Sequence, residues 1–199
     1  MAKMVRNPNN PFAAPGYLEA VRRLVNTLDI EAGIDHLGER EDGQRWLADW
    51  GFLGDSSELS SSELGHIRDL REALRTLMDA DRTHGETQQA RSVLTDALRR
   101  GTRPVVMEDR IGFEVIGEGI DRVLGVVASI VAKGMVDGSW ERMKVCSNDS
   151  CRWAFFDGSR NRTSRWCRME TCGNRAKARR YRERHTSARS TSFRPVGAR

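Results

Sequence analysis

The chain has 199 residues, and its 38% hydrophobic and 31% charged residues are the balance of a folded globular protein rather than a disordered one. Its longest apolar stretch, residues 123–132, is far shorter than the ~20 residues that span a bilayer, which argues against a membrane helix. The net charge of +5 is unevenly divided, because residues 1–139 carry 17 Lys and Arg against 23 Asp and Glu, whereas residues 140–199 carry 16 against 5. We therefore expect only the C-terminal part to contact a polyanion.

Residues 1–15 predict a loose arm and no secretory signal. Prolines and asparagines follow Lys3 and Arg6, where a signal peptide would have an apolar run. We expect a cytoplasmic protein without a membrane partner, in which the cysteines stay reduced.

Hydrophobic residues at helical spacing predict a series of helices before residue 102. The serine-rich linker 56–62 contains a capping box, because Ser60 can accept from the backbone of Glu63 while the Glu63 side chain reaches back. Gly51 stands in the position of a C-terminal glycine cap, and Gly101 follows the last helix of the series. The apolar positions, helix by helix, are Leu18, Val21, Leu24, Val25 and Leu28; Trp46, Leu47 and Trp50; Leu64, Ile67, Leu70, Leu74, Leu77 and Met78; and Ala90, Val93, Leu94, Ala97 and Leu98.

Three polar residues near the end of the first predicted helix, Asn26, Thr27 and Asp29, admit two interpretations. They could line a small-molecule pocket of the N-terminal domain, which would then bind an unidentified effector. They could instead terminate the helix or hold a turn, as short polar side chains commonly do. We favour the structural role.

The hydrophobic period changes after residue 103. Residues 104–107 and 111–116 flank a short polar segment, a pattern that predicts a β-hairpin. Helical spacing then returns at Ile120, Val123, Leu124, Val127, Ile130 and Val131, and we expect Gly134 and Gly138 to erode the end of this helix. We place a domain boundary near residues 137–141, so that residues 1–139 form a mainly helical domain with a small hairpin.

All four cysteines lie in the basic part of the chain, as Cys146-x4-Cys151 and Cys167-x4-Cys172 with fifteen residues between the pairs. Each pair can supply half of a tetrahedral shell, and the span lets the chain turn back. Four thiolates leave no open position for a substrate, so we expect one structural Zn²⁺ per chain that replaces a missing apolar core. The alternatives are two disulfides, which conflict with a cytoplasmic location, or unrelated buried thiols. The aromatic residues between the pairs could stack on bases, but we expect them to pack around the metal; they are Trp153, Phe155, Phe156 and Trp166.

An arginine-rich helix is predicted directly after the last cysteine, over residues 173–185. At 100° per residue its cations form two stripes, with Cys172, Ala176 and Glu183 between them and facing the metal. Few acids follow residue 157, so the sequence favours contact with nucleic acid over a simply solvated charged helix. The candidate contact residues are Arg175, Arg179 and Arg182 on one stripe, Lys177, Arg180 and Arg184 on the other, and Arg160, Arg162, Arg165 and Arg168 in the loop before the second cysteine pair. Residues 186–199 lack periodicity and predict a disordered basic tail.

The string from Cys146 through Cys172-Gly-Asn-Arg175 and Lys177 resembles the CGNR zinc-finger family of bacterial proteins. The resemblance maps the four cysteines onto that family's zinc ligands. It also implies a small treble-clef-like finger at residues 140–185, with the last ligands at the start of the final helix. Such proteins usually carry an N-terminal ABATE domain, which residues 24–29 and 46–53 resemble, and they are regarded as stress-induced transcription regulators. The expected fold class is therefore α+β.

These observations predict a DNA-binding transcription regulator whose finger contacts DNA and whose N-terminal domain senses a signal, forms a homodimer, or both. An RNA- or ribosome-binding factor and a zinc module for protein–protein contact are the alternatives. We do not expect an enzyme, because the chain has no Gly-x4-Gly-Lys or His-Glu-x2-His motif and its four histidines are scattered.

Overall fold

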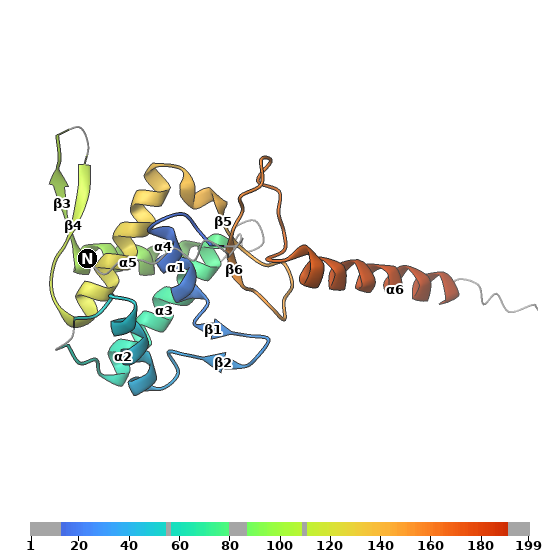
Figure 1. Ribbon diagram of the computed structural model, residues 1–199, viewed down its shortest axis with the longest axis horizontal. Helices are drawn as coiled ribbons and strands as arrows, with labels where there is room; N and C mark the ends of the chain where they lie inside the picture. The colour runs from blue at the N-terminus through green and yellow to red at the C-terminus, as the bar shows by residue number, and fades with distance from the viewer. Residues whose placement is uncertain (1–12, 55–56, 80–86, 109–110, 191–199) are drawn as a thin grey trace, which may run out of the picture.

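The computed structural model describes residues 13–54, 57–79, 87–108 and 111–190, with side chains as far as residue 185 (Figure 1). Helices make up most of this described part. The helices are α1 (Leu18–Val25), α2 (Arg40–Asp49), α3 (Ser61–Met78), α4 (Thr87–Gly101), α5 (Gly119–Val136) and α6 (Asn174–Ser190), with a 3-10 turn η1 (Ser139–Arg142) and a π-helical turn η2 (Met169–Gly173). The strands form three antiparallel pairs, β1 (Leu28–Asp29) with β2 (Ile34–Asp35), β3 (Thr102–Val106) with β4 (Ile111–Val115), and β5 (Met143–Val145) with β6 (Ala154–Phe156). This is the α+β fold that the sequence predicts.

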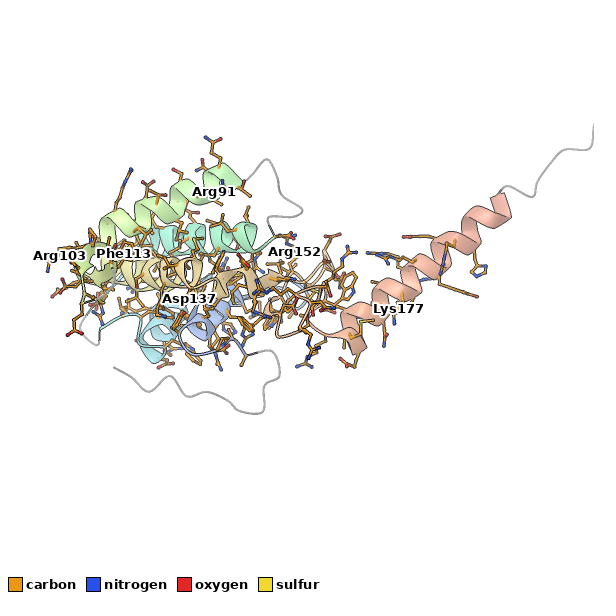
Figure 2. The ribbon with its side chains drawn as sticks, turned by 90° about the horizontal axis from the view of Figure 1, so that it is seen from above. Arg91, Arg103, Phe113, Asp137, Arg152 and Lys177 are labelled. Atoms are coloured by element: carbon orange, nitrogen blue, oxygen red, sulfur yellow. The ribbon has the colours of Figure 1, made fainter. Side chains whose placement is uncertain are left out.

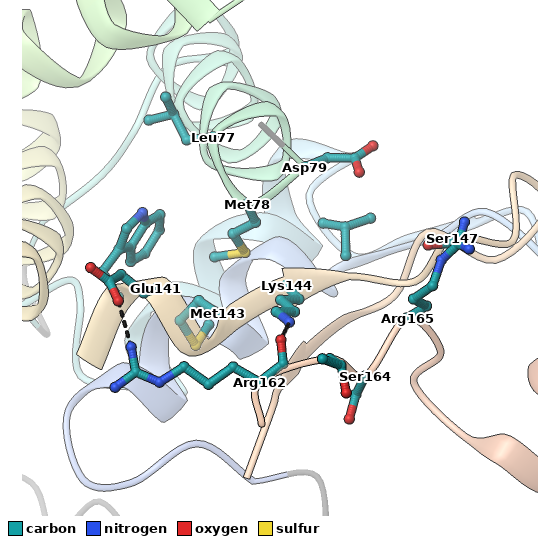
Figure 3. A pocket seen from close by; sticks show the side chains of 13 residues that line it. Leu77, Met78, Asp79, Glu141, Met143, Lys144, Ser147, Arg162, Ser164 and Arg165 are labelled. Carbon is teal, nitrogen blue, oxygen red and sulfur yellow. Dashed lines mark hydrogen bonds and ion pairs between the residues drawn. The ribbon is translucent and has the colours of Figure 1, made fainter. Parts of the chain in front are cut away.

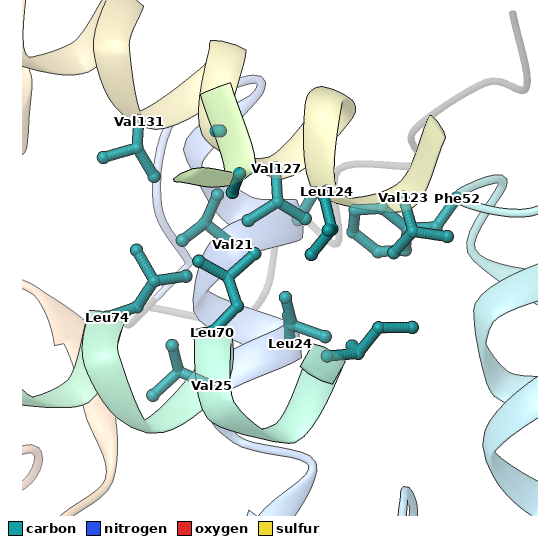
Figure 4. Close-up of a cluster of buried hydrophobic side chains, with 14 of the residues drawn as sticks. Val21, Leu24, Val25, Phe52, Leu70, Leu74, Val123, Leu124, Val127 and Val131 are labelled. Atoms are coloured by element: carbon teal, nitrogen blue, oxygen red, sulfur yellow. The ribbon is translucent and has the colours of Figure 1, made fainter. Parts of the chain in front are cut away.

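The hydrophobic core lies where α1, α3 and α5 meet, and α4 packs against α3 and α5 (Figure 4). Each helix turns its predicted apolar face inward, so that Leu24, Leu70 and Val127 are fully buried. Met143, Val145 and Ala154 of the last sheet belong to the same core. The C-terminal module is therefore seated on the body rather than linked to it by a free tether.

Two helix ends confirm the predicted local signals. The Ser60 hydroxyl accepts from the Glu63 N–H at 3.3 Å, and the Glu63 carboxylate accepts from the Ser60 N–H at 2.7 Å. At the end of α2, Gly51 has a φ of +69°, and the Phe52 N–H donates to the Leu47 carbonyl at 2.9 Å. That Schellman ending requires a left-handed residue, which glycine supplies without strain.

Other boundaries differ from the prediction. Helix α1 ends at Val25, so Leu28 lies in β1 instead of on its apolar face. Helix α5 continues through Gly134, which is buried against Leu18, and ends before Gly138 at a φ of +76°. The end of the predicted loose arm is fixed as well, because Ala14 is buried and its N–H donates to the Glu19 carboxylate; residues 1–12 lie outside the described residues.

The predicted disordered tail also needs correction at its start. Helix α6 extends to Ser190, because neither proline nor glycine interrupts residues 174–190, and residues 191–199 lie outside the described part. Among the residues that the structure describes, none of the helices combines the length and the apolar character that crossing a membrane requires.

The contact between α4 and α5 gives a first prediction. A Cβ at Gly101 would lie 2.3 Å from both the Asp121 carbonyl oxygen and the Gly125 nitrogen, so the two backbones touch. We expect Gly101→Ala to lower the free energy of unfolding by about 2–3 kcal/mol, because the helices must move apart. Gly65→Ala on α3 is the matched control, because the nearest atom to a Cβ there is 3.9 Å away. Alanine should raise the free energy of unfolding at this position by at most about 1 kcal/mol. Urea unfolding of both variants measures the difference, and equal stabilities would contradict the packing.

Candidate metal centre and nucleic-acid interface

The connection between β5 and β6 carries the first cysteine pair. It folds into a knuckle because the Cys146 N–H donates to the Trp153 carbonyl at 2.9 Å and the Cys151 N–H donates to the Asn148 carbonyl at 2.9 Å. The Ser147 N–H donates to the carbonyl of Arg165 at 2.8 Å, which brings the segment before Cys167 alongside. Turn η2 then delivers Cys172 directly at the start of α6.

The four sulfur atoms form one cluster, since each lies within 4.8 Å of the others. Cys167 Sγ is 3.7 Å from Cys151 Sγ and 3.8 Å from Cys172 Sγ. A tetrahedral ion with bonds of about 2.3 Å to sulfur would set its ligands about 3.8 Å apart, so the residues fit a metal ion. A disulfide would require about 2.05 Å, and all four cysteines are free.

Close packing couples the protonation of three of these thiols, those of Cys146, Cys151 and Cys167. Hydrogen bonds from Cys151 and Cys167 lower the pKa of Cys146 to about 2. The same interaction with Cys146 raises the pKa of Cys151 to about 12, and it also raises the pKa of Cys167. Ionisation of Cys146 therefore opposes ionisation of Cys151 and Cys167 unless positive charge lies between them. A divalent cation bound to all four sulfurs would supply that charge.

The surrounding aromatic residues divide between two environments. Trp153 and Trp166 pack against the cysteine cluster, as predicted. Phe156 packs on the main core instead, because β6 lies on the body, so the expectation that it surrounds the metal is wrong.

Two buried side chains of the body clamp the segment that follows Cys151. The guanidinium of Arg75 on α3, which is 3% exposed, donates to the Arg152 carbonyl at 2.6 Å and to the last carbonyl of α1 at 2.6 Å. The Asn26 amide exchanges two hydrogen bonds with the backbone of Ala154, at 2.9 and 2.7 Å, as a neighbouring strand would. The knuckle is thus hydrogen-bonded to α1 and α3.

Arg152 holds an unusual conformation within this clamp. Its φ of +48° lies in the left-handed region, which costs a non-glycine residue free energy. The Arg152 guanidinium donates to the Asp79 carboxylate at 2.9 Å, and its carbonyl accepts from Arg75. These contacts hold the strained residue in place, so the knuckle geometry depends on α3.

The three candidate ligand-binding residues make contacts within the protein. Asn26 holds β6, the Thr27 hydroxyl donates to the Leu24 carbonyl at 2.7 Å, and the Asp29 carboxylate accepts from the Ala32 N–H at 3.0 Å. These contacts support the structural interpretation, while binding of an effector by these residues stays a prediction.

Asp157 organises the loop between the cysteine pairs, a role that sequence reasoning missed. Its buried carboxylate accepts from Lys144 Nζ at 2.8 Å, from the Ser159 N–H at 3.0 Å, and from the Ser164 N–H at 2.9 Å. Burial raises the pKa of Asp157, but the hydrogen bonds from Lys144, Ser159 and Ser164 outweigh burial and lower this pKa below its usual range. An isolated acid in a basic stretch was the available signal.

A groove of about 750 Å³ separates the end of α3 from the finger (Figure 3). Arg162 and Arg165, two of the candidate nucleic-acid contacts, line it from the finger side, and Arg162 pairs with Glu141 at 2.5 Å. Its apolar lining comes from α3, η1 and β5, namely Leu77, Met78, Trp140, Met143 and Val145.

Helix α6 projects away from the rest of the molecule (Figures 1 and 2). Every described side chain beyond Ala176 on this helix is exposed. All ten candidate nucleic-acid contacts are exposed too, namely Arg160, Arg162, Arg165, Arg168, Arg175, Lys177, Arg179, Arg180, Arg182 and Arg184. Exposure is a condition for contact, and contact itself stays a prediction.

Two residues of the α6 region differ from the predicted arrangement. Glu183 does not face the metal but is exposed and lies 4.0 Å from Arg179, because α6 leaves the cysteine cluster after its first turn. Arg175 pairs with Glu31 in the β1–β2 connection, so this cation also attaches α6 to the body.

Comparison with known families assigns both parts of the chain. The ABATE family model, described as "Putative stress-induced transcription regulator", matches residues 19–119, which is just over half of the 199 residues. The CGNR zinc finger model matches residues 142–185 and includes all four cysteines. The search of curated proteins finds no match.

The clamp generates a second prediction. Arg75→Met should lower the free energy of unfolding by about 2–4 kcal/mol, because it leaves the Arg152 carbonyl without its buried donor. It should also speed the loss of bound metal to a chelator, because the knuckle is less firmly held. Urea unfolding and a colorimetric metal-release assay measure the two effects.

Arg68→Met is the matched control on the same helix. Arg68 donates at 3.3 Å to the Gly38 carbonyl near the surface, so this variant should stay within about 0.5 kcal/mol of the parent. If both variants released metal at the parent rate, α3 would not support the knuckle.

Proposed function

The chain belongs to the ABATE family and carries a CGNR zinc finger, and on that premise we propose that it is a zinc-dependent, DNA-binding transcription regulator. The finger contacts DNA, and the body senses a signal or forms a dimer. The observation that carries this proposal is the exposed cationic helix α6, which begins at a four-cysteine cluster. The proposal is a binding function and assigns no catalysis.

Zinc is the proposed metal because of the donor set. Four thiolates at tetrahedral spacing suit Zn²⁺, whereas Mg²⁺ and Ca²⁺ prefer oxygen ligands. Cys146, Cys151, Cys167 and Cys172 would hold one ion per chain. A bound Zn²⁺ would supply positive charge that keeps the four sulfurs deprotonated and together. Its role is structural, because four sulfurs close the shell.

Helix α6 has the dimensions to enter a groove of duplex DNA. Its 17 residues span about 26 Å at 1.5 Å per residue, and a B-form major groove is about 12 Å wide. Its arginines can pair with phosphates through two nitrogens at once. Phosphate contacts would determine affinity, and the target sequence would depend on which of these side chains reaches a base.

The body is proposed to control the finger through their shared contacts. The groove between α3 and the finger is lined by both parts, so an effector bound there would touch Arg162 and Arg165 directly. The clamp at Arg75 and Asn26 provides the mechanical connection.

Metal content tests the zinc part of the proposal. Native mass spectrometry of the purified chain should find one zinc ion per chain. Cys167→Ser should lose that ion, because three sulfurs and a hydroxyl bind zinc far more weakly. Ser150→Ala, a change in the same module at a residue that is not a ligand, should keep it. A folded chain without metal would contradict the proposal.

Salt dependence tests nucleic-acid contact. Affinity for a duplex should fall as salt rises, and the pair Arg179→Gln and Arg180→Gln should flatten the slope of log K against log salt by about 1.8, which is 0.9 for each lost phosphate contact. The matched control removes two exposed arginines of α4, Arg91→Gln and Arg99→Gln. Fluorescence anisotropy at several salt concentrations measures the slopes.

Three outcomes would redirect the proposal. Equal slopes for the two pairs of substitutions would remove α6 from the interface. Stronger competition by structured RNA than by duplex DNA would favour the RNA-binding alternative. If the chain bound neither DNA nor RNA, the alternative of a zinc module for protein–protein contact would be favoured.

A further inference from the structure

The hairpin β3–β4 lies at the end of the molecule opposite α6, and much of its apolar surface is uncovered (Figure 1). Cross-strand pairing places Pro104 with Phe113 and Val106 with Ile111 on one face. Val106 is 89% exposed and Ile111 is 71% exposed. Large apolar side chains gathered on an exposed surface are better suited to a contact than to solvent.

The alternation of backbone hydrogen bonds along β4 shows which edge of the hairpin is unpaired. The Ile116 N–H donates to the Gly101 carbonyl at 2.9 Å, so the even-numbered residues of β4 point their backbone groups toward β3. The backbone groups of Ile111, Phe113 and Val115 therefore point outward, and they have no hydrogen-bond partner within the described residues.

The other edge of the hairpin is blocked. On β3, by the same alternation, the backbone N–H and C=O groups of residues 102, 104 and 106 point away from β4. Pro104, the middle one of these three residues, has no N–H to donate. A further strand can therefore add fully only to β4.

We propose that β4 pairs with β4 of a second copy of this chain, antiparallel about a two-fold axis at Phe113. Phe113 then faces the partner's Phe113, and Ile111 faces the partner's Val115, so both hairpins join in one four-stranded sheet. Each such pair exchanges two backbone hydrogen bonds, and the apolar face becomes continuous across the axis.

Charge selects a second copy over an oppositely charged partner. The other face of the hairpin carries Arg103 and Glu114, which pair with each other at 2.5 Å, so the two strands have no net charge. A polyanion or a strongly basic protein gains nothing there, whereas two copies approach without repulsion.

Charge also disfavours one of the neighbouring registers. In the proposed register Glu114 lies opposite the partner's Gly112, which has no side chain. If the two-fold axis lay at Glu114 instead, Glu114 would face the partner's Glu114. Repulsion between the two like charges would disfavour that register. The dimer leaves α6 of both copies at the far ends of the assembly, and the inference does not rest on zinc or on DNA.

Sedimentation of the full chain over a range of concentrations tests the association. The parent chain should shift from monomer to dimer as concentration rises, and Phe113→Lys, which sets two lysines together at the axis, should weaken association at least tenfold. Val106→Lys is the matched control, because Val106 lies on the same face but on the blocked edge; it should leave association within about threefold. Circular dichroism melts establish that each variant is folded.

Cysteine cross-linking tests the register. Phe113→Cys should form a covalent dimer under mild oxidation, because facing residues of such a pair have Cα atoms about 5.5 Å apart, within disulfide reach. In Ile111→Cys the two introduced cysteines would lie on opposite sides of the axis. This variant should therefore form no more covalent dimer than the parent chain does. A parent chain that is monomeric at every concentration, a Phe113→Lys chain that associates like the parent, or preferential cross-linking at position 111 would overturn the proposal.

Discussion

The C-terminal module of this molecule, residues 140–190, is organised around four sulfur atoms that lie within 4.8 Å of one another. At these distances the pKa of Cys146 is lowered while the pKa values of Cys151 and Cys167 are raised, and a bound cation would favour the ionised form of each ligand. The small sheet β5–β6 has three residues in each strand, too few to build a core of its own. The body's core covers this sheet, and α6 begins beside the cysteine cluster, where a metal ion would add further support.

The body supports the finger in a second way. Arg75 and Asn26 provide buried hydrogen bonds to the backbone that follows Cys151, at the strained residue Arg152. A buried guanidinium is costly unless its donors are satisfied, and this one is satisfied by carbonyls of both parts of the chain. The segment that follows Cys151 is therefore held by the fold of the body, and a metal ion bound at the cysteines would be coupled to that fold.

Local signals of this sequence predicted local structure well. The capping box at Ser60, the glycine end at Gly51 and the hydrophobic spacing of α3 and α5 were correct because each depends on a few neighbouring residues. The four cysteines were recognised as one site because metal chemistry restricts their spacing. The sequence could not indicate contacts between distant segments, such as those of Asn26 with Ala154 and of Arg75 with Arg152. Glu183 was misplaced because helical periodicity does not reveal where a helix leaves its support.

Hydrogen exchange of the metal-loaded and metal-free chain would test the central claim most directly. Without metal, the amides of Cys146, Cys151 and Ala154 should lose protection, and those of α3 beside Arg75 should lose part of theirs, while α4 keeps its protection. Unchanged protection of the knuckle after removal of the metal would contradict the account, because the finger would then be held together by something other than the ion.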